Sequence, residues 1–114
     1  MADNWLVEFY VDDRGRTPAY EFLSALPAKE RAEMLRVIDL LQEFGVKLGM
    51  PHARPIEGMW ELRAGAGRLF YVTVHGRRFI VLHGYRKKSQ AAPRKEIETA
   101  KRRWALFIER EEDR

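Results

Sequence analysis

The chain has 114 residues, 46% of them hydrophobic, and a formal net charge of +4, which fits one compact domain over residues 1–114. It contains no cysteine, so a disulfide framework, a thiolate nucleophile and a cysteine-ligated zinc are excluded. Its apolar stretches are too short to cross a bilayer and its start lacks the order of a secretory signal, so we expect a cytoplasmic protein with no membrane partner.

The N-terminal half predicts one strand and two helices. Residues 5–11 are β-branched and aromatic, which is typical of a strand. Thr17 followed by Pro18 predicts the start of a short helix that runs to about residue 25. Pro27 begins a second helix, in which apolar residues recur every three or four positions until Gly45 ends it.

The middle of the chain predicts a loop and then a three-stranded meander. Residues 46–58 contain two prolines and two glycines without periodicity, so we expect a connecting loop. Strands are predicted over residues 59–63, 68–74 and 78–83, with a glycine-containing turn between each pair. The apolar run of the third strand indicates a central position in the sheet.

Pro93 begins a last helix, with Ile97, Ala100, Trp104 and Phe107 or Ile108 on one stripe. The order β-α-α-β-β-β-α predicts an α+β fold, with the helices on one face of a mostly antiparallel sheet. We expect the first strand to lie beside the third strand of the meander or at its edge.

Charge is divided unevenly along the chain. Residues 1–62 hold seven Lys or Arg against eleven Asp or Glu, whereas residues 63–114 hold fourteen against six. A basic half favours a polyanionic partner such as RNA or DNA, although a solvated basic face with no specific partner fits the composition equally well.

The candidate catalytic and binding residues lie on the meander and just after it. Arg63 and Arg68 flank a turn with two glycines, and Lys87 and Lys88 follow the strand that ends at His83. Antiparallel pairing brings the start of one strand beside the end of its neighbour, so we expect Arg68 and His83 to be close. The whole set is Arg63, Arg68, Tyr71, His83, Tyr85, Arg86, Lys87 and Lys88.

This set suits phosphodiester cleavage without a metal or other cofactor. Attack by a ribose 2′-hydroxyl on the adjacent phosphate builds negative charge that fixed guanidinium groups stabilise. His83 is the member whose ordinary pKa lies near neutrality, whereas a Lys or Tyr would need a pKa lowered by neighbouring positive charge. Each residue also has a structural alternative: Arg63 as an ion-pair partner, Tyr71 as a sheet residue, His83 as a hydrogen-bonded core residue.

Four stretches resemble one known family when their order and spacing are taken together. They are Trp60-Glu61-Leu62-Arg63, residues 67–71 (GRLFY), residues 82–90 (LHGYRKKSQ) and residues 93–100 (PRKEIETA). In this combination the chain resembles the phage-derived Gp49-like branch of the RelE/HigB/ParE toxin superfamily, over almost its whole length.

The resemblance implies the toxin of a type II toxin–antitoxin pair. Such toxins are metal-independent endoribonucleases that cut messenger RNA on the ribosome. The implied partner is a helix-turn-helix antitoxin, and operator DNA is contacted only through it. Two alternatives stay open: a ParE-like inhibitor of a topoisomerase such as gyrase, and a non-catalytic RNA-binding or operon-regulating subunit.

The resemblance also assigns roles to residues. Arg68 matches the arginine that stabilises the transition state, and Lys87 or Lys88 matches the basic residue after the last strand. We therefore predict Arg68, His83, Lys87 and Lys88 as catalytic and Arg63, Tyr71, Tyr85 and Arg86 as RNA-binding. Some relatives have lysine where Glu61 stands and tyrosine where Arg94 stands, so the general base stays unassigned.

Overall fold

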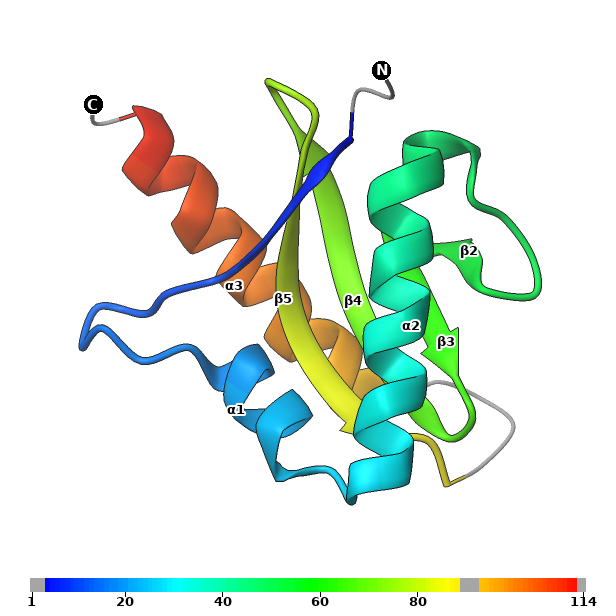
Figure 1. Cartoon of the computed structure of the whole chain (residues 1–114). Helices are drawn as coiled ribbons and strands as arrows, with labels where there is room; N and C mark the ends of the chain where they lie inside the picture. The colour runs from blue at the N-terminus through cyan, green and yellow to red at the C-terminus, as the bar shows by residue number, and fades with distance from the viewer. Residues whose placement is uncertain (1–3, 89–92, 113–114) are drawn as a thin grey trace.

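The computed structural model describes residues 4–88 and 93–112, which form a five-stranded sheet with three α-helices (Figure 1). Within these residues no helix has the length and apolar character needed to cross a membrane. The elements in chain order are β1 (Leu6–Phe9), α1 (Pro18–Ala25), α2 (Ala28–Phe44), the 3-10 turn η1 (Gly45–Lys47), β2 (Ala53–Ile56), β3 (Met59–Ala64), β4 (Gly67–Val74), β5 (Arg78–Arg86) and α3 (Arg94–Glu112).

The sheet has the strand order β1-β5-β4-β3-β2 and is mostly antiparallel. Strand β1 lies at one edge and pairs with β5 in parallel. The predicted α+β class, the meander and the place of the first strand beside the third meander strand are therefore confirmed. The helices predicted at Pro18 and Pro27 are also confirmed; α2 begins at Ala28, directly after Pro27, which makes no side-chain capping bond.

The prediction of a loop throughout residues 46–58 is wrong, because β2 lies within it. Strand β2 pairs with β3 across a tight turn in which Glu57 and Gly58 both have positive φ. Pro55 cannot donate a ladder hydrogen bond, and an edge strand tolerates this. The strand is short and its sequence does not alternate, so nothing in the hydrophobic pattern revealed it.

Helices cover both faces of the sheet, so the expectation that they share one face is wrong. Figure 1 shows α1 and α2 in front of the sheet and α3 behind it. The first core joins α1 and α2 to side chains such as Leu62, Leu69 and Phe79. The second core joins α3 to Phe70 and Ile80. Since β4 is buried at consecutive positions, both of its faces need a covering layer.

A β-bulge in β5 redirects the end of that strand. Tyr71 pairs with Val81 and Phe70 pairs with His83, which leaves Leu82 as the extra residue. Leu82 belongs to the second core and His83 contacts α3, so two consecutive side chains lie on the same face. Bulges commonly re-aim side chains in this way.

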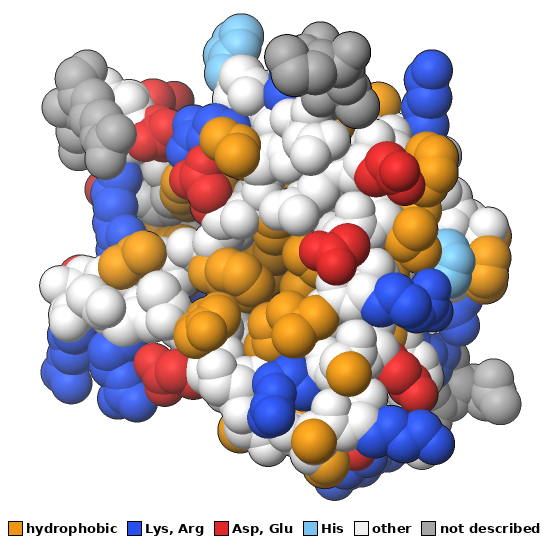
Figure 2. Space-filling view, viewed as in Figure 1, with side chains coloured by type: hydrophobic (Ala, Val, Ile, Leu, Met, Phe, Trp, Pro, Cys, Tyr) orange, Lys and Arg blue, Asp and Glu red, His pale blue; other side chains and the backbone are white. Residues whose placement is uncertain are grey.

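The first core is not fully covered between its two helices. Figure 2 shows apolar side chains gathered over the centre of that face, between α1 and α2. Val7, Phe9 and Phe22 pack against this core while staying partly exposed, and Tyr20 contacts Phe9 edge to face with ring centroids 5.3 Å apart. The short helix α1 therefore leaves part of the sheet open beside α2.

Gly84 lies where α1 approaches β5 too closely for a side chain. A Cβ added there would lie 2.4 Å from Cδ2 of Phe22 and 2.9 Å from Cδ2 of Leu69. We expect Gly84→Ala to lower the free energy of unfolding by about 1–3 kcal/mol, measured by urea denaturation. Gly49→Ala is the control, because its Cβ would meet no heavy atom within 4 Å. Equal losses in the two variants would contradict the close approach.

Candidate nucleic-acid interface

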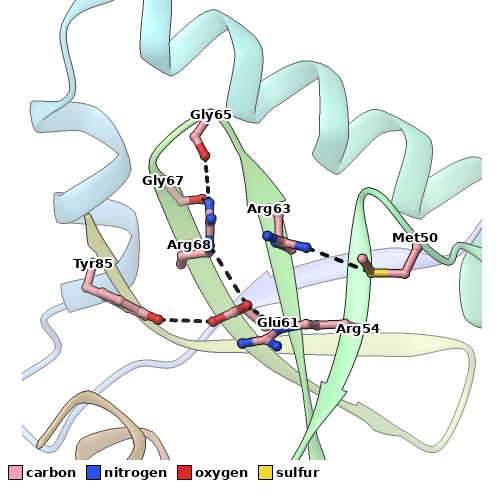
Figure 3. Close-up of polar contacts among 8 residues, drawn as sticks. All are labelled: Met50, Arg54, Glu61, Arg63, Gly65, Gly67, Arg68 and Tyr85. Carbon is pink, nitrogen blue, oxygen red and sulfur yellow. Dashed lines mark hydrogen bonds and ion pairs between the residues drawn. The ribbon is translucent and has the colours of Figure 1, made fainter. Parts of the chain in front are cut away.

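A fully buried carboxylate, Glu61 on β3, is the centre of a polar cluster at the hairpin end of the sheet (Figure 3). Arg54 donates from Nε to its Oε1 at 2.8 Å, and the Tyr85 hydroxyl donates to its Oε2 at 3.0 Å. Nε of Arg68 lies 3.8 Å from Oε1. Strands β2, β4 and β5 thus each supply one partner to a charge on β3.

Arg68 is held by the turn that precedes it. Its Nη1 donates to the carbonyl oxygens of Gly65 at 2.7 Å and Gly67 at 2.9 Å. The residue is only 6% exposed, and its buried Nε has no hydrogen-bond partner in the part of the chain that the structure describes. Burial, and then the nearby Arg63 guanidinium, hold the pKa of Arg68 below its ordinary value. The guanidinium is therefore fixed before any ligand arrives.

Lys87 and Arg63 complete a group of cations around Glu61. The backbone N–H of Lys87 donates to the carbonyl of Ala66 at 2.8 Å, which places the residue beside the hairpin turn. Partial desolvation and then the Arg68 charge lower the pKa of the Lys87 ammonium. Arg63 pairs with Arg68 across the hairpin, as its place beside the two-glycine turn suggested. Four cations, Arg54, Arg63, Arg68 and Lys87, therefore surround one carboxylate; we call them the Glu61 cluster.

His83 lies outside the Glu61 cluster, between the sheet and α3. Its Nε2 is 2.6 Å from Oε1 of Glu96, and its Nδ1 is 3.0 Å from Nη1 of Arg103. Arginine can only donate, so Nδ1 accepts and Nε2 carries the proton that it donates to Glu96. The register pairs Arg68 with Tyr85 and His83 with Phe70, and the side-chain partners described for His83 come from α3. His83 fastens α3 to the sheet.

Two of the predicted RNA-binding tyrosines are buried. Tyr71 is 3% exposed in the first core and meets Phe79 edge to face, and burial raises its pKa. It lies three positions from Arg68 along β4, so the alternation of side chains puts it on the opposite face. Tyr85 is also buried, tilted against Phe70, with its hydroxyl on Glu61. Both rings pack inside the protein in this structure, and the Tyr85 hydroxyl orients the Glu61 carboxylate.

The remaining basic residues after β5 lie at different places. Nη2 of Arg86 is 2.8 Å from Oε1 of Glu30, so this side chain turns towards α2 and away from the Glu61 cluster. Lys88 is exposed. Ser89 and Gln90, which the sequence motif includes, lie outside the described residues.

Sequence reasoning missed Arg54 as a member of the site. Arg54 lies on β2, a strand that the sequence pattern does not predict, and the β2–β3 register places it opposite Glu61. The available signal was the turn at Glu57 and Gly58, since a hairpin there would bring residues 53–56 back along β3. Within residues 4–88 and 93–112 no three His, Asp or Glu side chains gather in an arrangement that could hold a metal ion.

Glu57 anchors the start of α3 to the same β2–β3 turn. Its Oε2 lies 2.6 Å from Nη2 of Arg94, and its Oε1 lies 2.6 Å from Nζ of Lys101. These hydrogen bonds lower the pKa of Glu57 to about 2. Arg94 thus holds the start of α3 against the β2–β3 turn.

Burial of His83 makes stability depend on pH. Burial, which outweighs the opposing hydrogen bond to Glu96, lowers the pKa of His83 in the folded protein. The unfolded chain then takes up a proton at higher pH than the folded protein, so the free energy of unfolding falls as pH drops below about 6.5. Urea denaturation between pH 7.5 and 5 should show this slope, with a shallower slope in His83→Gln. His75→Gln, in the exposed β4–β5 turn, should keep it. An unchanged slope in His83→Gln would contradict the assignment.

Glu61 should matter more to stability than an exposed carboxylate with similar bonds. Glu61→Gln keeps the shape but leaves the buried Arg68 charge uncompensated, so we expect a loss of about 3 kcal/mol in the free energy of unfolding. Glu8→Gln is the matched control, because Glu8 pairs with Arg78 through two hydrogen bonds at a partly exposed site. Glu8→Gln should lower the free energy of unfolding by less than about 1 kcal/mol. Similar losses in urea denaturation would show that Glu61 is not the centre of the cluster.

Comparison with known proteins supports the resemblance drawn from the motifs. The chain is similar in fold to a chain in the crystal structure of the toxin–antitoxin complex RelBE2 from Mycobacterium tuberculosis, with a TM-score of 0.55 and 19% sequence identity, over 74% of this chain and 99% of that chain. No curated protein sequence matches it significantly. The pattern of the family described as phage-derived protein Gp49-like matches residues 21–105. That match extends from α1 well into α3 and includes every residue of the Glu61 cluster, so this chain belongs to the phage-derived Gp49-like family.

Proposed function

We propose that this protein is the toxin of a type II toxin–antitoxin pair and that it cuts messenger RNA on the ribosome. Membership of the Gp49-like family and a fold similar to a chain of RelBE2 support the toxin assignment. The observation that carries the nuclease assignment is the Glu61 cluster, in which a rigidly held guanidinium lies beside a lysine of lowered pKa.

The proposed reaction starts with attack of a ribose 2′-oxygen on the adjacent phosphorus. A P–O bond forms to the 2′-oxygen as its proton passes to solvent, and the bond to the 5′-oxygen breaks as that oxygen takes a proton, leaving a 2′,3′-cyclic phosphate and a 5′-hydroxyl. Negative charge builds on the non-bridging oxygens during attack. Arg68 and Arg63 would stabilise that charge, and Arg68 needs little reorganisation because two carbonyls already hold it.

Lys87 is the proposed general acid. The leaving 5′-oxygen needs a proton, and a lysine donates one more readily when its pKa is lowered. Desolvation and the Arg68 charge lower the pKa of Lys87 in this cluster. His83, which the sequence suggested for proton transfer, has both ring nitrogens engaged by α3. The Tyr85 hydroxyl is engaged by Glu61.

The proposed partners are the ribosome with its message and an antitoxin of the helix-turn-helix kind, which would also be the link to operator DNA. The fold neighbour is part of a toxin–antitoxin complex, which supports an antitoxin partner. An acidic segment of that antitoxin would neutralise the four cations around Glu61 and block access of RNA. We accordingly propose action in the cytoplasm, where translation takes place.

Lys87→Ala tests the nuclease proposal directly. With translating ribosomes and a defined message, we expect the wild-type protein to cut and Lys87→Ala to cut about 100-fold more slowly, because the general acid is lost. Lys29→Ala removes the same charge from the exposed start of α2 and should cut normally. The 5′ ends of the fragments report the cleavage positions.

Two outcomes would overturn this proposal. One is a message that stays intact with the wild-type protein while gyrase supercoiling is inhibited, which would indicate a topoisomerase inhibitor. The other is equal cleavage by Lys87→Ala and Lys29→Ala, which would remove Lys87 from the chemistry.

A further inference from the structure

A cavity of about 290 Å³ lies between α2 and the β3–β4 hairpin, next to the Glu61 cluster. We propose that it binds one nucleotide of single-stranded RNA, through its phosphate and its base, beside the nucleotides that are cut. This inference rests on the proposed function and extends it to a second binding position. Its lining includes Arg36 of α2, Pro51 and His52 before β2, and Arg63 and Arg68 of the hairpin.

The charges of the cavity favour an anion. Three guanidinium groups, from Arg36, Arg63 and Arg68, line it together with a single carboxylate, Glu33. Arginine forks match phosphate oxygens better than any other side chain. The lining is therefore suited to a phosphate group of a nucleic-acid strand.

Arg63 adds an unsatisfied donor. Its Nε is buried and has no hydrogen-bond partner within residues 4–88 and 93–112, and its Nη1 contacts the weak acceptor Sδ of Met50 at 3.8 Å, as Figure 3 shows. An unpaired buried donor carries a desolvation cost that a phosphate oxygen would remove. The side chain is thus better satisfied with an anion bound than without one.

The size and the remaining lining favour a nucleotide over a simple ion. Small-molecule sites usually measure about 300–1,000 Å³, so a cavity of about 290 Å³ has room for one nucleotide and not for several. The imidazole of His52 lines the cavity, and unpaired RNA bases stack on aromatic rings of this kind. Pro51 adds an apolar surface beside it. Met50, 65% exposed, extends this apolar surface beside Arg63.

The cavity continues the Glu61 cluster and can still be tested separately. Arg63 and Arg68 belong to both, so neighbouring phosphates of one strand could be held at once. Arg36 lines the cavity but is not part of the Glu61 cluster, is exposed on α2, and has no bond to Glu61 among the described contacts. Changing Arg36 therefore probes the cavity without disturbing the group around the carboxylate.

The experiment measures binding of a 2′-O-methyl RNA hexamer, which lacks the attacking hydroxyl, by fluorescence anisotropy. We expect Arg36→Ala to raise the Kd about tenfold and to reduce the slope of log Kd against log salt by about 1, the loss of one phosphate contact. Arg14→Ala, an arginine in the exposed turn before α1, is the matched control and should leave both unchanged. Equal effects of the two variants would overturn the inference.

The ring resonances of His52 supply the second readout. They should shift when the hexamer is added, whereas those of His75 in the exposed β4–β5 turn should not. An equal shift of His52 with inorganic phosphate at the same concentration would show a general anion site and overturn the nucleotide assignment.

The cleavage assay separates this inference from the proposed function. Arg36→Ala should raise KM for the message and leave kcat unchanged, whereas Lys87→Ala should lower kcat. If the hexamer binds in the cavity but no message is cut, the subsite stands and the nuclease proposal falls. If Lys87→Ala abolishes cleavage while Arg36→Ala behaves like Arg14→Ala, the nuclease proposal stands and the subsite falls.

Discussion

The buried charge of Glu61 is the constraint on which the hairpin end of the sheet depends. A carboxylate removed from water is tolerated only when it is paired and hydrogen-bonded, and here β2, β4 and β5 each supply a partner. The same charge offsets a conflict between neighbours, because Arg63 and Arg68 stand directly opposite each other and would otherwise repel. One side chain therefore fixes the relative positions of four strands and keeps several cations together.

On the α3 side of the sheet, some polar residues hold α3 in place and others stay open to solvent. The difference arises because α3 is attached to the sheet at specific points. His83 binds Glu96 and Arg103, and Glu57 binds Arg94 and Lys101. These contacts hold the helix over Phe70, Ile80 and Leu82. The group around Glu61 lies beyond this covered area, at the hairpin turn, where Lys87 and Arg54 keep partial access to solvent. Attachment of α3 thus decides which polar residues become structural and which stay available to a ligand.

The sequence predicts the parts of this site that follow from local geometry. A turn with two glycines determines that Arg63 and Arg68 face each other, so their pairing could be foreseen. The place of His83 could not, because a one-residue bulge leaves no mark in the hydrophobic pattern. The face chosen by α3 was equally hidden, since an amphipathic stripe fits either side of a sheet. Tyr71 is different. Side chains alternate along β4, so the sequence alone predicts that Tyr71 and Arg68 lie on opposite faces of the sheet.

An excess of positive charge around one carboxylate links the stability of this site to its affinity for an anion. Glu61 balances one of the four cations, and the depressed pKa values of Arg68 and Lys87 reflect burial together with the repulsion that remains. A phosphate placed among these groups would relieve that repulsion and satisfy the buried donor of Arg63. The polyanion would then bind the folded protein more tightly than the unfolded chain, which stabilises the fold by mass action. The features that weaken the free protein locally are therefore the ones that favour a bound polyanion, which is what the proposed function requires.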